Sequence, residues 1–256
     1  MDTLVVGAGT MGRWLGRCLA GAAGWNVAFA DSDAAAAESA ATLLDARAVD
    51  IDGEERFDLV CVAVPISATE AAIAEYAPRA SEAILDVSGV MAGPVRAMDE
   101  HAADRERASL HPLFAPSNEP GNVAVVLGAD GPVLQAVREV LADRGNELFE
   151  TTPEEHDEAM RTVQARAHAA ILAYALAAED VPDRFHTPIS AELEAVADLV
   201  TGNEPSVYAE IQGAFPGAAD VAEAAQRIAE ADDEAFERLY REAADETGET
   251  GGGGGI

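Results

Sequence analysis

The chain has 256 residues, enough for one large domain or two smaller ones with a substantial apolar core. Its 47 acidic residues outnumber 16 basic residues, all of them arginine, and the net charge is −31. The absence of lysine excludes Schiff-base catalysis and a phosphate-loop lysine, and the excess of acid disfavours nucleic-acid binding. Acid spread along the whole chain favours a halophilic protein, kept soluble in concentrated salt, over one that binds a cationic partner.

The sequence also carries signals about location. No segment approaches the roughly 18 uninterrupted apolar residues of a membrane span, and residues 1–6 lack the basic start of a signal peptide. Cys18 and Cys61 are the only cysteines, which is typical of free thiols in a reducing compartment. We therefore expect a cytoplasmic protein with no membrane partner and no metal site.

Strands alternate with helices through the first 150 residues. We expect strands over residues 3–6, 26–30, 59–64, 83–87, 108–110, 123–127 and 147–150, with helices over 11–23, 33–44, 68–76 and 132–144. The run over 59–64 is continuously apolar, as in a parallel strand that is covered on both faces. This order predicts an α/β fold: an N-terminal Rossmann domain over residues 1–150, built on a doubly wound parallel sheet.

After residue 150 the pattern becomes entirely helical. Thr152 followed by Pro153 and Glu155 is a strong helix start, and that helix should run to about Ala178. Further helices are expected over residues 190–200, 204–215 and 220–245. The pattern predicts a C-terminal all-α domain over 151–247. We expect it to form a homodimer, because helical domains of this kind often bury their apolar face against a symmetry mate. The glycine-rich tail over 248–256 is expected to be disordered.

The first strand leads into a dinucleotide-binding fingerprint. Gly7 permits a tight turn, Gly9 lets the backbone approach a pyrophosphate, and Gly12 allows the following helix to pack closely. The helix start at Thr10 and Met11 supplies free N–H groups for the phosphates. Asp31, at the end of the second strand, can accept hydrogen bonds from both ribose hydroxyls and would repel a 2′-phosphate, so NAD is favoured over NADP. A glycine turn that binds FAD, or no ligand, is the alternative.

Other candidate residues follow the ends of later strands, where doubly wound sheets bind their ligands. Val64 and Pro65 end one strand over the expected cofactor site. His111 ends another, and a neutral histidine there could accept a proton from a substrate hydroxyl while the same carbon loses hydride. Position alone leaves catalytic and structural roles for His111 equally open.

Five segments in the same order make the chain resemble the prephenate dehydrogenases of tyrosine biosynthesis, an aromatic amino acid pathway. These are residues 62–66 over the cofactor, the loop over 86–94, the catalytic-histidine motif over 111–116, the long helix with its His-Asp pair and later polar residues over 156–168, and the segment over 205–211. The resemblance spans nearly the whole chain apart from the tail. It implies NAD-dependent oxidative decarboxylation of prephenate to 4-hydroxyphenylpyruvate.

The resemblance also implies roles for individual residues. His111 would deprotonate the ring hydroxyl, and His168 would line the substrate site together with Gln164 on the same helix face. Ser88 and Gly89 would contact the substrate, and Ser88, one position before the family's serine, would supply the catalytic hydroxyl after a local shift. The histidines at 101, 156 and 186 are expected to be surface or structural residues.

The sequence departs from the family pattern at three positions. Gly89 stands where the family has a serine, Met91 where it has a lysine, and Leu199 where it has an arginine that holds a substrate carboxylate. Arg161, Arg184 or an arginine of a dimer mate could replace the last of these. The alternatives are therefore an arogenate-preferring relative, another NAD-linked reductase, or a non-catalytic dinucleotide sensor.

Overall fold

The computed structural model describes residues 1–250, and none of the helices in that range is long and apolar enough to cross a membrane. The chain divides into two compact units, Met1–Met160 and Arg161–Ile256. The boundary expected after residue 150 precedes helix α6 (Pro153–Met160), which contacts helix α4 (Ala92–His101) and so belongs to the first unit. We describe the two units separately.

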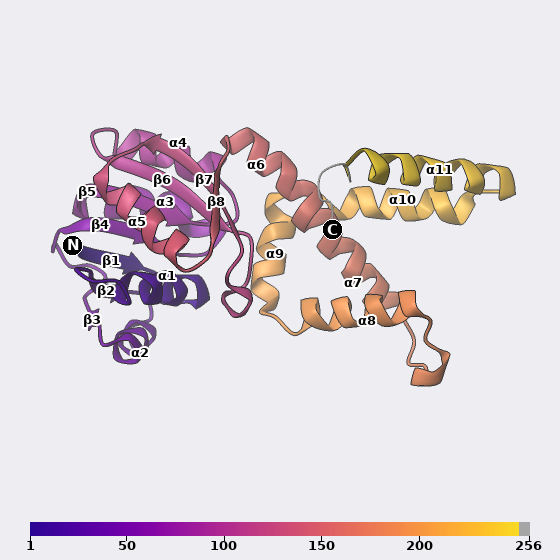
Figure 1. The fold of residues 1–256 in the computed structure, drawn as a ribbon, viewed down its shortest axis with the longest axis horizontal. Coiled ribbons are helices and arrows are strands. Elements are labelled where there is room, and N and C mark those ends of the chain that lie inside the picture. Colours follow the sequence, from indigo (N-terminus) through magenta and orange to yellow (C-terminus); the bar gives the residue numbers. More distant parts are fainter. Residues whose placement is uncertain (251–256) are drawn as a thin grey trace. The chain divides into compact units, whose positions relative to one another are not determined.

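The first unit is built on one sheet of eight strands, in the order β3-β2-β1-β4-β5-β6-β7-β8 (Figure 1). All neighbouring strands are parallel except β6 and β7. The strands are β1 (Asp2–Val6), β2 (Asn26–Ala30), β3 (Arg47–Ala48), β4 (Phe57–Val62), β5 (Ala80–Val87), β6 (Glu106–Pro112), β7 (Asn122–Ala129) and β8 (Glu147–Glu150). The predicted doubly wound sheet is confirmed.

The antiparallel pairing of β6 with β7 corrects the expectation of a wholly parallel sheet. Residues 113–121 connect the two strands and contain only the short 3₁₀ turn η2 (Pro116–Asn118). A parallel pairing needs a crossover of about a dozen residues or more, usually a helix. The connection is too short for that crossover, so the chain turns back along β6 instead.

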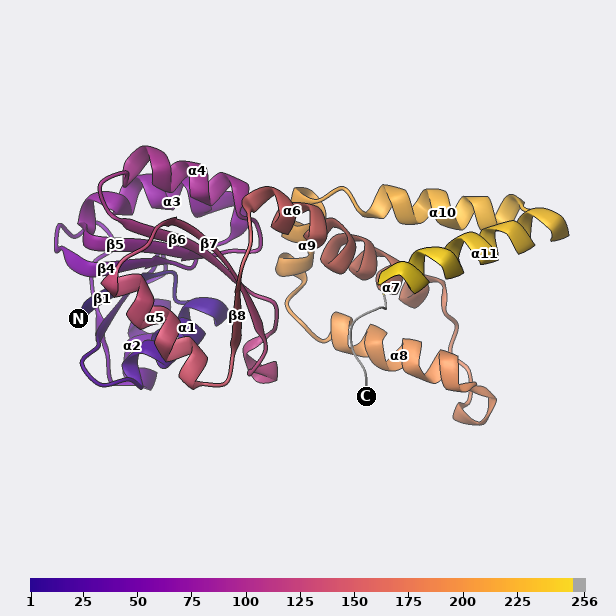
Figure 2. The ribbon, with the colours of Figure 1, turned by 45° about the horizontal axis from the view of Figure 1, so that its top comes forward.

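Helices cover both faces of the sheet in the first unit. Figure 2 shows α3 and α4 on one face and α1, α2 and α5 on the other. The helices are α1 (Thr10–Ala20), α2 (Ala34–Leu44), α3 (Ile66–Tyr76), α4 and α5 (Pro132–Asp143), with the 3₁₀ turn η1 (Ala77–Arg79) after α3. The sequence did not predict α4 or the two-residue strand β3, because Gly93 and Pro94 in the first turn of α4 obscure its helical pattern.

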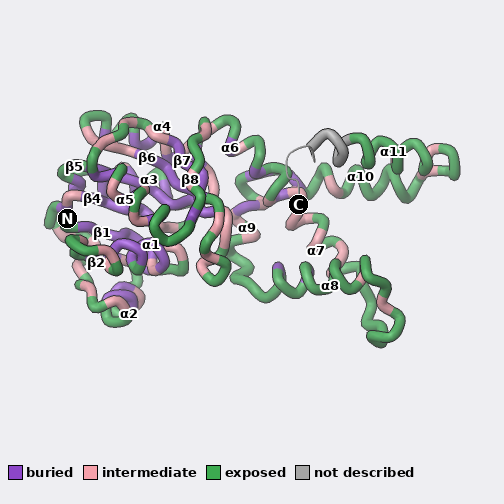
Figure 3. Tube along the Cα trace, in the orientation of Figure 1, coloured by how far each residue is buried: buried purple, intermediate pink, exposed green. Residues whose placement is uncertain are grey.

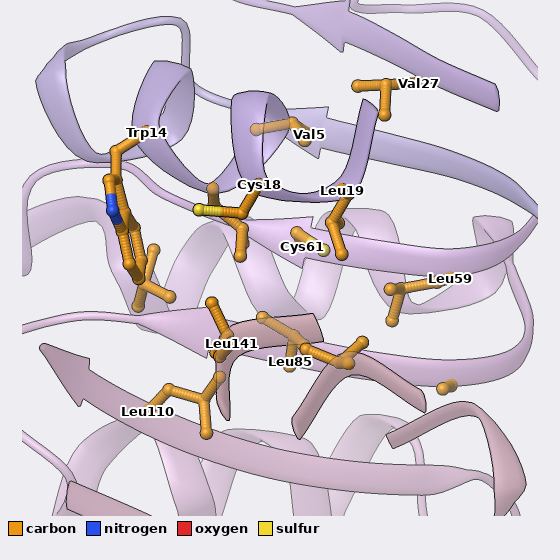
Figure 4. Packing of buried hydrophobic residues seen from close by; sticks show 14 of the residues in the cluster. Val5, Trp14, Cys18, Leu19, Val27, Leu59, Cys61, Leu85, Leu110 and Leu141 are labelled. Atoms are coloured by element: carbon orange, nitrogen blue, oxygen red, sulfur yellow. The ribbon is translucent and has the colours of Figure 1, made fainter. Parts of the chain in front are cut away.

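The core lies on both faces of this sheet, because alternate residues of each strand point to opposite faces. Val5 packs beneath α1 and α5, while its neighbours Leu4 and Val6 pack beneath α3 and α4. Figure 4 shows the first of these clusters, where Trp14 and Cys18 of α1 meet residues of the strands. Cys18 and Cys61 are both buried free thiols, as predicted.

The second unit contains only helices among its described residues. They are the π-helical turn η3 (Arg161–Arg166), α7 (Ala167–Ala177), the 3₁₀ turn η4 (Asp183–Phe185), α8 (Pro188–Thr201), α9 (Pro205–Ala214), α10 (Ala218–Glu230) and α11 (Asp233–Thr250). The first predicted helix, over 152–178, is therefore three segments in succession, with a π-helical turn in the middle. Thr152 does cap its start, accepting a hydrogen bond from the Glu155 N–H.

One predicted helix in the second unit is wrong. The expected helix over 220–245 is interrupted between Glu230 and Asp233, because the Asp232 carboxylate accepts a hydrogen bond from the Ala235 N–H and begins a new helix there. The glycine-rich tail predicted to be disordered starts at residue 248, but α11 extends to Thr250; residues 251–256 lie outside the described residues. Figure 3 shows that α8 and α10 are largely exposed, whereas buried segments concentrate in the sheet unit.

Candidate functional site

The candidate site lies at the carboxyl edge of the sheet in the first unit. Strands β1, β2, β4, β5 and β6 are parallel, so the residues that follow them meet at one edge. The predicted residues at this edge are Gly7, Asp31, Val64, Ser88, Gly89 and His111 with their sequence neighbours. Tertiary structure thus brings together all the candidates of the first unit, which the sequence spreads over about a hundred residues.

The glycine turn has the geometry that each glycine was expected to provide. Gly7 has φ of +99°, a conformation that side-chain-bearing residues rarely adopt, and a Cβ there would overlap the Ala63 carbonyl oxygen. A Cβ on Gly12 would overlap the Gly7 carbonyl oxygen, so the helix can approach the turn only with glycine at this position. Gly9 has φ of −73°, and a Cβ there would have no atom within 4 Å. Its environment therefore leaves room for a ligand.

The start of α1 can bind the phosphates of a dinucleotide. Gly9 is its N-cap and no side chain caps the first turn, which contains Thr10 and Met11 and no acidic residue. The free N–H groups and the positive end of the helix dipole favour an anion. Val64 closes the turn from β4, with its Cγ1 atom 3.2 Å from the Cβ position of Gly7, and Pro65 follows as the exposed N-cap of α3. These residues fit a dinucleotide.

Asp31 is held in place directly beside the glycine turn. Its Oδ2 atom accepts a hydrogen bond from the Ala8 N–H at 2.7 Å, and its Oδ1 atom accepts one from the Asp33 N–H at 2.8 Å. A carboxylate has about four acceptor positions, so acceptor capacity is left for ribose hydroxyls. The side chain is only partly exposed, and its orientation is set by backbone groups on both sides.

His111 belongs to a buried chain of hydrogen bonds. Its Nδ1 atom lies 2.8 Å from Nε2 of His156, and Nδ1 of His156 lies 2.8 Å from Oδ1 of Asp157. The Asp157 carboxylate also accepts hydrogen bonds from the N–H groups of Met91 at 2.9 Å and Ala92 at 3.1 Å. His111 and His156 are 7% and 3% exposed. The expectation that His156 is a surface or purely structural residue therefore needs revision, because it contacts the candidate base directly.

The charges in this chain follow from burial and hydrogen bonding. Burial, reinforced by neighbouring His156 and opposed by Asp157, lowers the pKa of His111 to about 3. Burial alone would raise the pKa of Asp157, but hydrogen bonds from His156, Met91 and Ala92 outweigh it and leave that pKa below its ordinary value. At neutral pH a neutral His111 can therefore act as a base, and Asp157 is ionised.

The loop after β5 places Gly89 beside His111. A Cβ on Gly89 would lie 3.8 Å from Nε2 of His111 and 3.4 Å from the Ile66 side chain. Ser88 is buried, and its hydroxyl donates a hydrogen bond to the Val90 carbonyl at 2.7 Å. Of the two predicted substrate-loop residues, Gly89 is thus the one next to Nε2 of the candidate base.

The predicted residues of the second unit lie in and after the π-helical turn. Gln164 is within η3, and His168 is in the first turn of α7. The four-residue spacing predicts that Gln164 and His168 lie on one face of a regular α-helix. A π-helical turn has i→i+5 hydrogen bonds, so that spacing argument does not hold here.

Contacts within the second unit hold the π-helical turn in place. The Gln212 side-chain amide donates to the Ala165 carbonyl at 2.8 Å, and a Cβ on Gly217 would overlap the backbone of Ala165 and Arg166. Single π-helical turns within α-helices are frequent at functional sites. This turn precedes His168, whose ring packs edge-on against Tyr208, with centroids 4.7 Å apart. Nδ1 of His168 is buried and has no hydrogen-bond partner among the described residues.

The second unit does not identify which arginine would bind a substrate carboxylate. Leu199, where the resemblance leads us to expect an arginine, is 61% exposed. Arg166 donates hydrogen bonds to Asp220 and Thr162, both at 2.8 Å, and Arg184 lies over the ring of Phe185.

The sequence prediction did not place His156 and Asp157 beside His111. The two are adjacent in sequence, and Met160 follows His156 by four residues, so both fall on one side of α6. Both are buried. That spacing was a usable signal that His156 faces the interior, although it does not identify His111 as its partner.

Three comparisons bear on this site. Residues 21–127 match the family model described as prephenate dehydrogenase, nucleotide-binding domain; the match begins after the glycine turn and includes Asp31, Ser88 and His111. A probable arogenate/prephenate dehydrogenase of Methanocaldococcus jannaschii is 25% identical over 94% of the chain and 60% of its own length. A 4-amino-4-deoxyprephenate dehydrogenase of Streptomyces pristinaespiralis is 33% identical over 65% of the chain and 61% of its own length.

The chain therefore spans about three fifths of the length of these two relatives. Among solved structures, it is similar to a crystal structure of prephenate dehydrogenase from A. aeolicus in complex with hydroxyphenyl propionate and NAD+. The TM-score is 0.65 at 17% identity, over 96% of this chain and 97% of that chain. At that identity the likeness concerns the fold.

Proposed function

Because the chain belongs to the prephenate dehydrogenase family, we propose that it is an NAD-dependent dehydrogenase that oxidatively decarboxylates prephenate to 4-hydroxyphenylpyruvate. The observation that supports this most is the position of His111. A buried, neutral imidazole stands beside Gly89, at the same sheet edge as the glycine turn and Asp31. A base next to a nicotinamide site suits the oxidation of a carbon that carries a hydroxyl group.

In this proposal the residues of the first unit bind the NAD cofactor. Gly7, Gly9 and Gly12, with the N–H groups of Thr10 and Met11, hold the pyrophosphate, and Asp31 accepts bonds from the adenosine ribose. Val64 and Pro65 border the dinucleotide on the β4 side. When bound, the oxidised nicotinamide accepts a hydride from the substrate's ring carbon. The Asp31 carboxylate would repel a 2′-phosphate, which supports NAD rather than NADP.

The chemical step balances without an external acid. Nε2 of His111 accepts the proton of the ring hydroxyl as its carbon is oxidised, and the carbon–carboxylate bond breaks to release CO2. The electron pair of that bond restores the aromatic ring and leaves negative charge on the ring oxygen. His111 then returns the proton to this oxygen, so the reaction releases no net proton. Orientation is the main contribution of the protein.

We propose that Gln164 and His168 bind the substrate from the helical unit, and that Ser88 and Gly89 bind it from the loop after β5. The buried Nδ1 atom of His168, which has no hydrogen-bond partner among the described residues, supports a ligand-binding role, because such groups are costly unless a ligand completes them. The substrate carboxylate needs a cation. Arg161, Arg184 and an arginine of a second copy are the candidates.

Arogenate is the second candidate substrate, since the relative from M. jannaschii is named for both compounds. Arogenate carries an amino group where prephenate carries a keto group on its side chain. An acid-rich chain that lacks an arginine at Leu199 is better suited to a cationic amino group than a chain with that arginine. Comparing the rates of turnover with prephenate and with arogenate distinguishes the two candidates.

We also propose a homodimer formed through the helical unit. Among its described residues, Leu176, Ile189 and Phe185 are 87%, 72% and 67% exposed, and α7 contains no buried residue. Large apolar side chains this exposed favour an interface with a second copy. Light scattering in molar salt should give twice the mass of the chain, and a monomer would contradict the proposal.

The deciding experiment follows reduced nicotinamide by absorbance in molar salt, with prephenate and with arogenate. His111→Ala should lower turnover by roughly 100-fold or more while the dissociation constant for NAD changes little. His101→Ala, at an exposed histidine of α4, is the matched control and should match the unmodified protein. Absence of turnover with both substrates, in protein that still binds NAD, would sink the proposal.

A further inference from the structure

The hydrogen-bond chain behind His111 determines where its proton must lie. An ionised carboxylate can only accept hydrogen bonds, and Asp157 accepts them from the N–H groups of Met91 and Ala92. The third bond to Asp157 comes from Nδ1 of His156, so this nitrogen carries hydrogen. In neutral His156 the other nitrogen, Nε2, is then an acceptor. A neutral His156 therefore accepts this bond from Nδ1 of His111, whereas a protonated His156 would donate it.

The same assignment fixes the chemistry of the opposite side of the His111 ring. With Nδ1 protonated, a neutral His111 carries its lone pair on Nε2, which is the atom that lies nearest to the Cβ position of Gly89. The reverse tautomer would put hydrogen on Nε2 and make it unable to accept a proton. With His156 neutral, the chain from Asp157 through His156 thus makes Nε2 the basic nitrogen of His111.

We propose that His156 and Asp157 are positioning residues that hold His111 in its Nδ1-protonated tautomer and share the positive charge that it gains during the reaction. Charge sharing rests on the proposed dehydrogenase function, whereas the positioning of His111 does not. When Nε2 of His111 takes the hydroxyl proton, an O–H bond breaks and an N–H bond forms. The Nδ1 proton can then move to Nε2 of His156, and the sequence reverses when the ring oxygen recovers its proton.

The surroundings favour sharing of the charge over keeping it on His111. His111 is 7% exposed, and burial opposes an imidazolium there. Moving the charge to His156 places it at 2.8 Å from the Asp157 carboxylate, where it forms an ion pair. The alternative is that the three residues merely fasten α6 to the start of α4. A fastening role needs the hydrogen bonds but neither a particular tautomer of His111 nor a charge on Asp157.

Three variants separate these roles. His156→Phe removes both the acceptor for His111 and the charge carrier. His156→Gln keeps an oxygen that can accept from His111 and an amide that can donate to Asp157, but it cannot be protonated. Asp157→Asn keeps one oxygen that can accept from His156 and the Met91 N–H, and it removes the charge. His101→Phe, at an exposed position of α4, is the control.

The first measurement is the nitrogen-15 NMR spectrum of the full chain labelled at histidine, recorded without substrate. We expect His111 to be protonated at Nδ1 in the unmodified protein, in His156→Gln and in His101→Phe, and to gain the Nε2-protonated form in His156→Phe. An Nε2-protonated His111 in the unmodified protein would overturn the proposal. An unchanged tautomer in folded His156→Phe would overturn it too. If His156→Phe does not fold, His156→Ala replaces it, with the same expected gain of the Nε2-protonated form.

The second measurement is steady-state turnover. Asp157→Asn and His156→Gln should lower kcat roughly 10-fold or more with KM and NAD affinity nearly unchanged, by analogy with the acid that orients a catalytic histidine in hydrolases. Unchanged kcat in both variants would refute charge sharing. If neither prephenate nor arogenate is turned over by the unmodified protein, the proposed function fails, whereas the tautomer measured by NMR still decides the positioning role.

Discussion

Asp86 is a buried carboxyl group in β5, two residues before Ser88, and its replacement by asparagine gives a quantitative test of the site's electrostatics. The residue is 0% exposed, and burial raises the pKa of its carboxyl group from 3.8 to about 7. Its neighbours in the sheet are Val62 of β4 and Ser109 of β6. No arginine lies among these neighbours, so ionisation in the folded state is disfavoured.

The sign of the effect follows from the proton balance. Below pH 3.8 the carboxyl group of Asp86 is protonated in both states, so it imposes no cost. Between pH 3.8 and about 7 the folded state keeps a proton that the unfolded chain has lost, so the free energy of unfolding falls as pH rises. At about 1.4 kcal/mol per pH unit, the cost reaches about 4 kcal/mol at neutral pH and stays constant above it.

Asp86→Asn cannot titrate, so the variant should lack this loss. Its free energy of unfolding, minus that of the unmodified protein, should increase by about 4 kcal/mol between pH 4 and pH 8. Denaturant unfolding at constant molar salt over this range measures the difference. Asp143→Asn, at an exposed position of α5, removes the same charge and serves as the control. Parallel pH curves for Asp86→Asn and the unmodified protein would refute the argument.

Three further outcomes are expected. Gly9→Val should leave the fold intact, because its Cβ position is open, yet should weaken NAD binding by about 10-fold or more by blocking the pyrophosphate; calorimetry that finds unchanged affinity would contradict this. Asp31→Ala should reduce the preference for NAD over NADP in turnover, and an unchanged ratio would remove Asp31 as the discriminating residue. Because the net charge is −31, circular dichroism should show unfolding in dilute buffer and refolding in molar salt; equal spectra in both would argue against halophilic adaptation.

The cofactor half of the candidate site was accessible from the sequence because it depends on neighbouring residues. A turn with φ of +99° at Gly7 and a helix that approaches it at Gly12 are requirements of local sterics. Asp31 follows the next strand at a spacing set by one helix and one strand. Such constraints act within about 30 residues, so they require particular residue types at particular positions of the sequence.

The catalytic half was predicted only in part. His111 could be placed at a strand end, but its contact with His156 joins residues 45 positions apart through the packing of α6. Likewise, the conformation of the loop after β5 places Gly89 next to Nε2 of His111, whereas the Ser88 hydroxyl binds the Val90 carbonyl. The π-helical turn before His168 leaves no pattern in the sequence, because its stabilising contact comes from Gln212.

The sequence by itself thus determined the alternation of strands and helices and the glycine turn. It also determined that Asp31 and His111 stand at strand ends. Only the tertiary structure decided that β7 runs antiparallel to β6 and that α6 brings His156 and Asp157 to His111. The physical reason is range. Backbone sterics and hydrophobic periodicity act between near neighbours and are recorded in residue type, whereas a hydrogen bond between distant residues depends on how all the intervening elements pack.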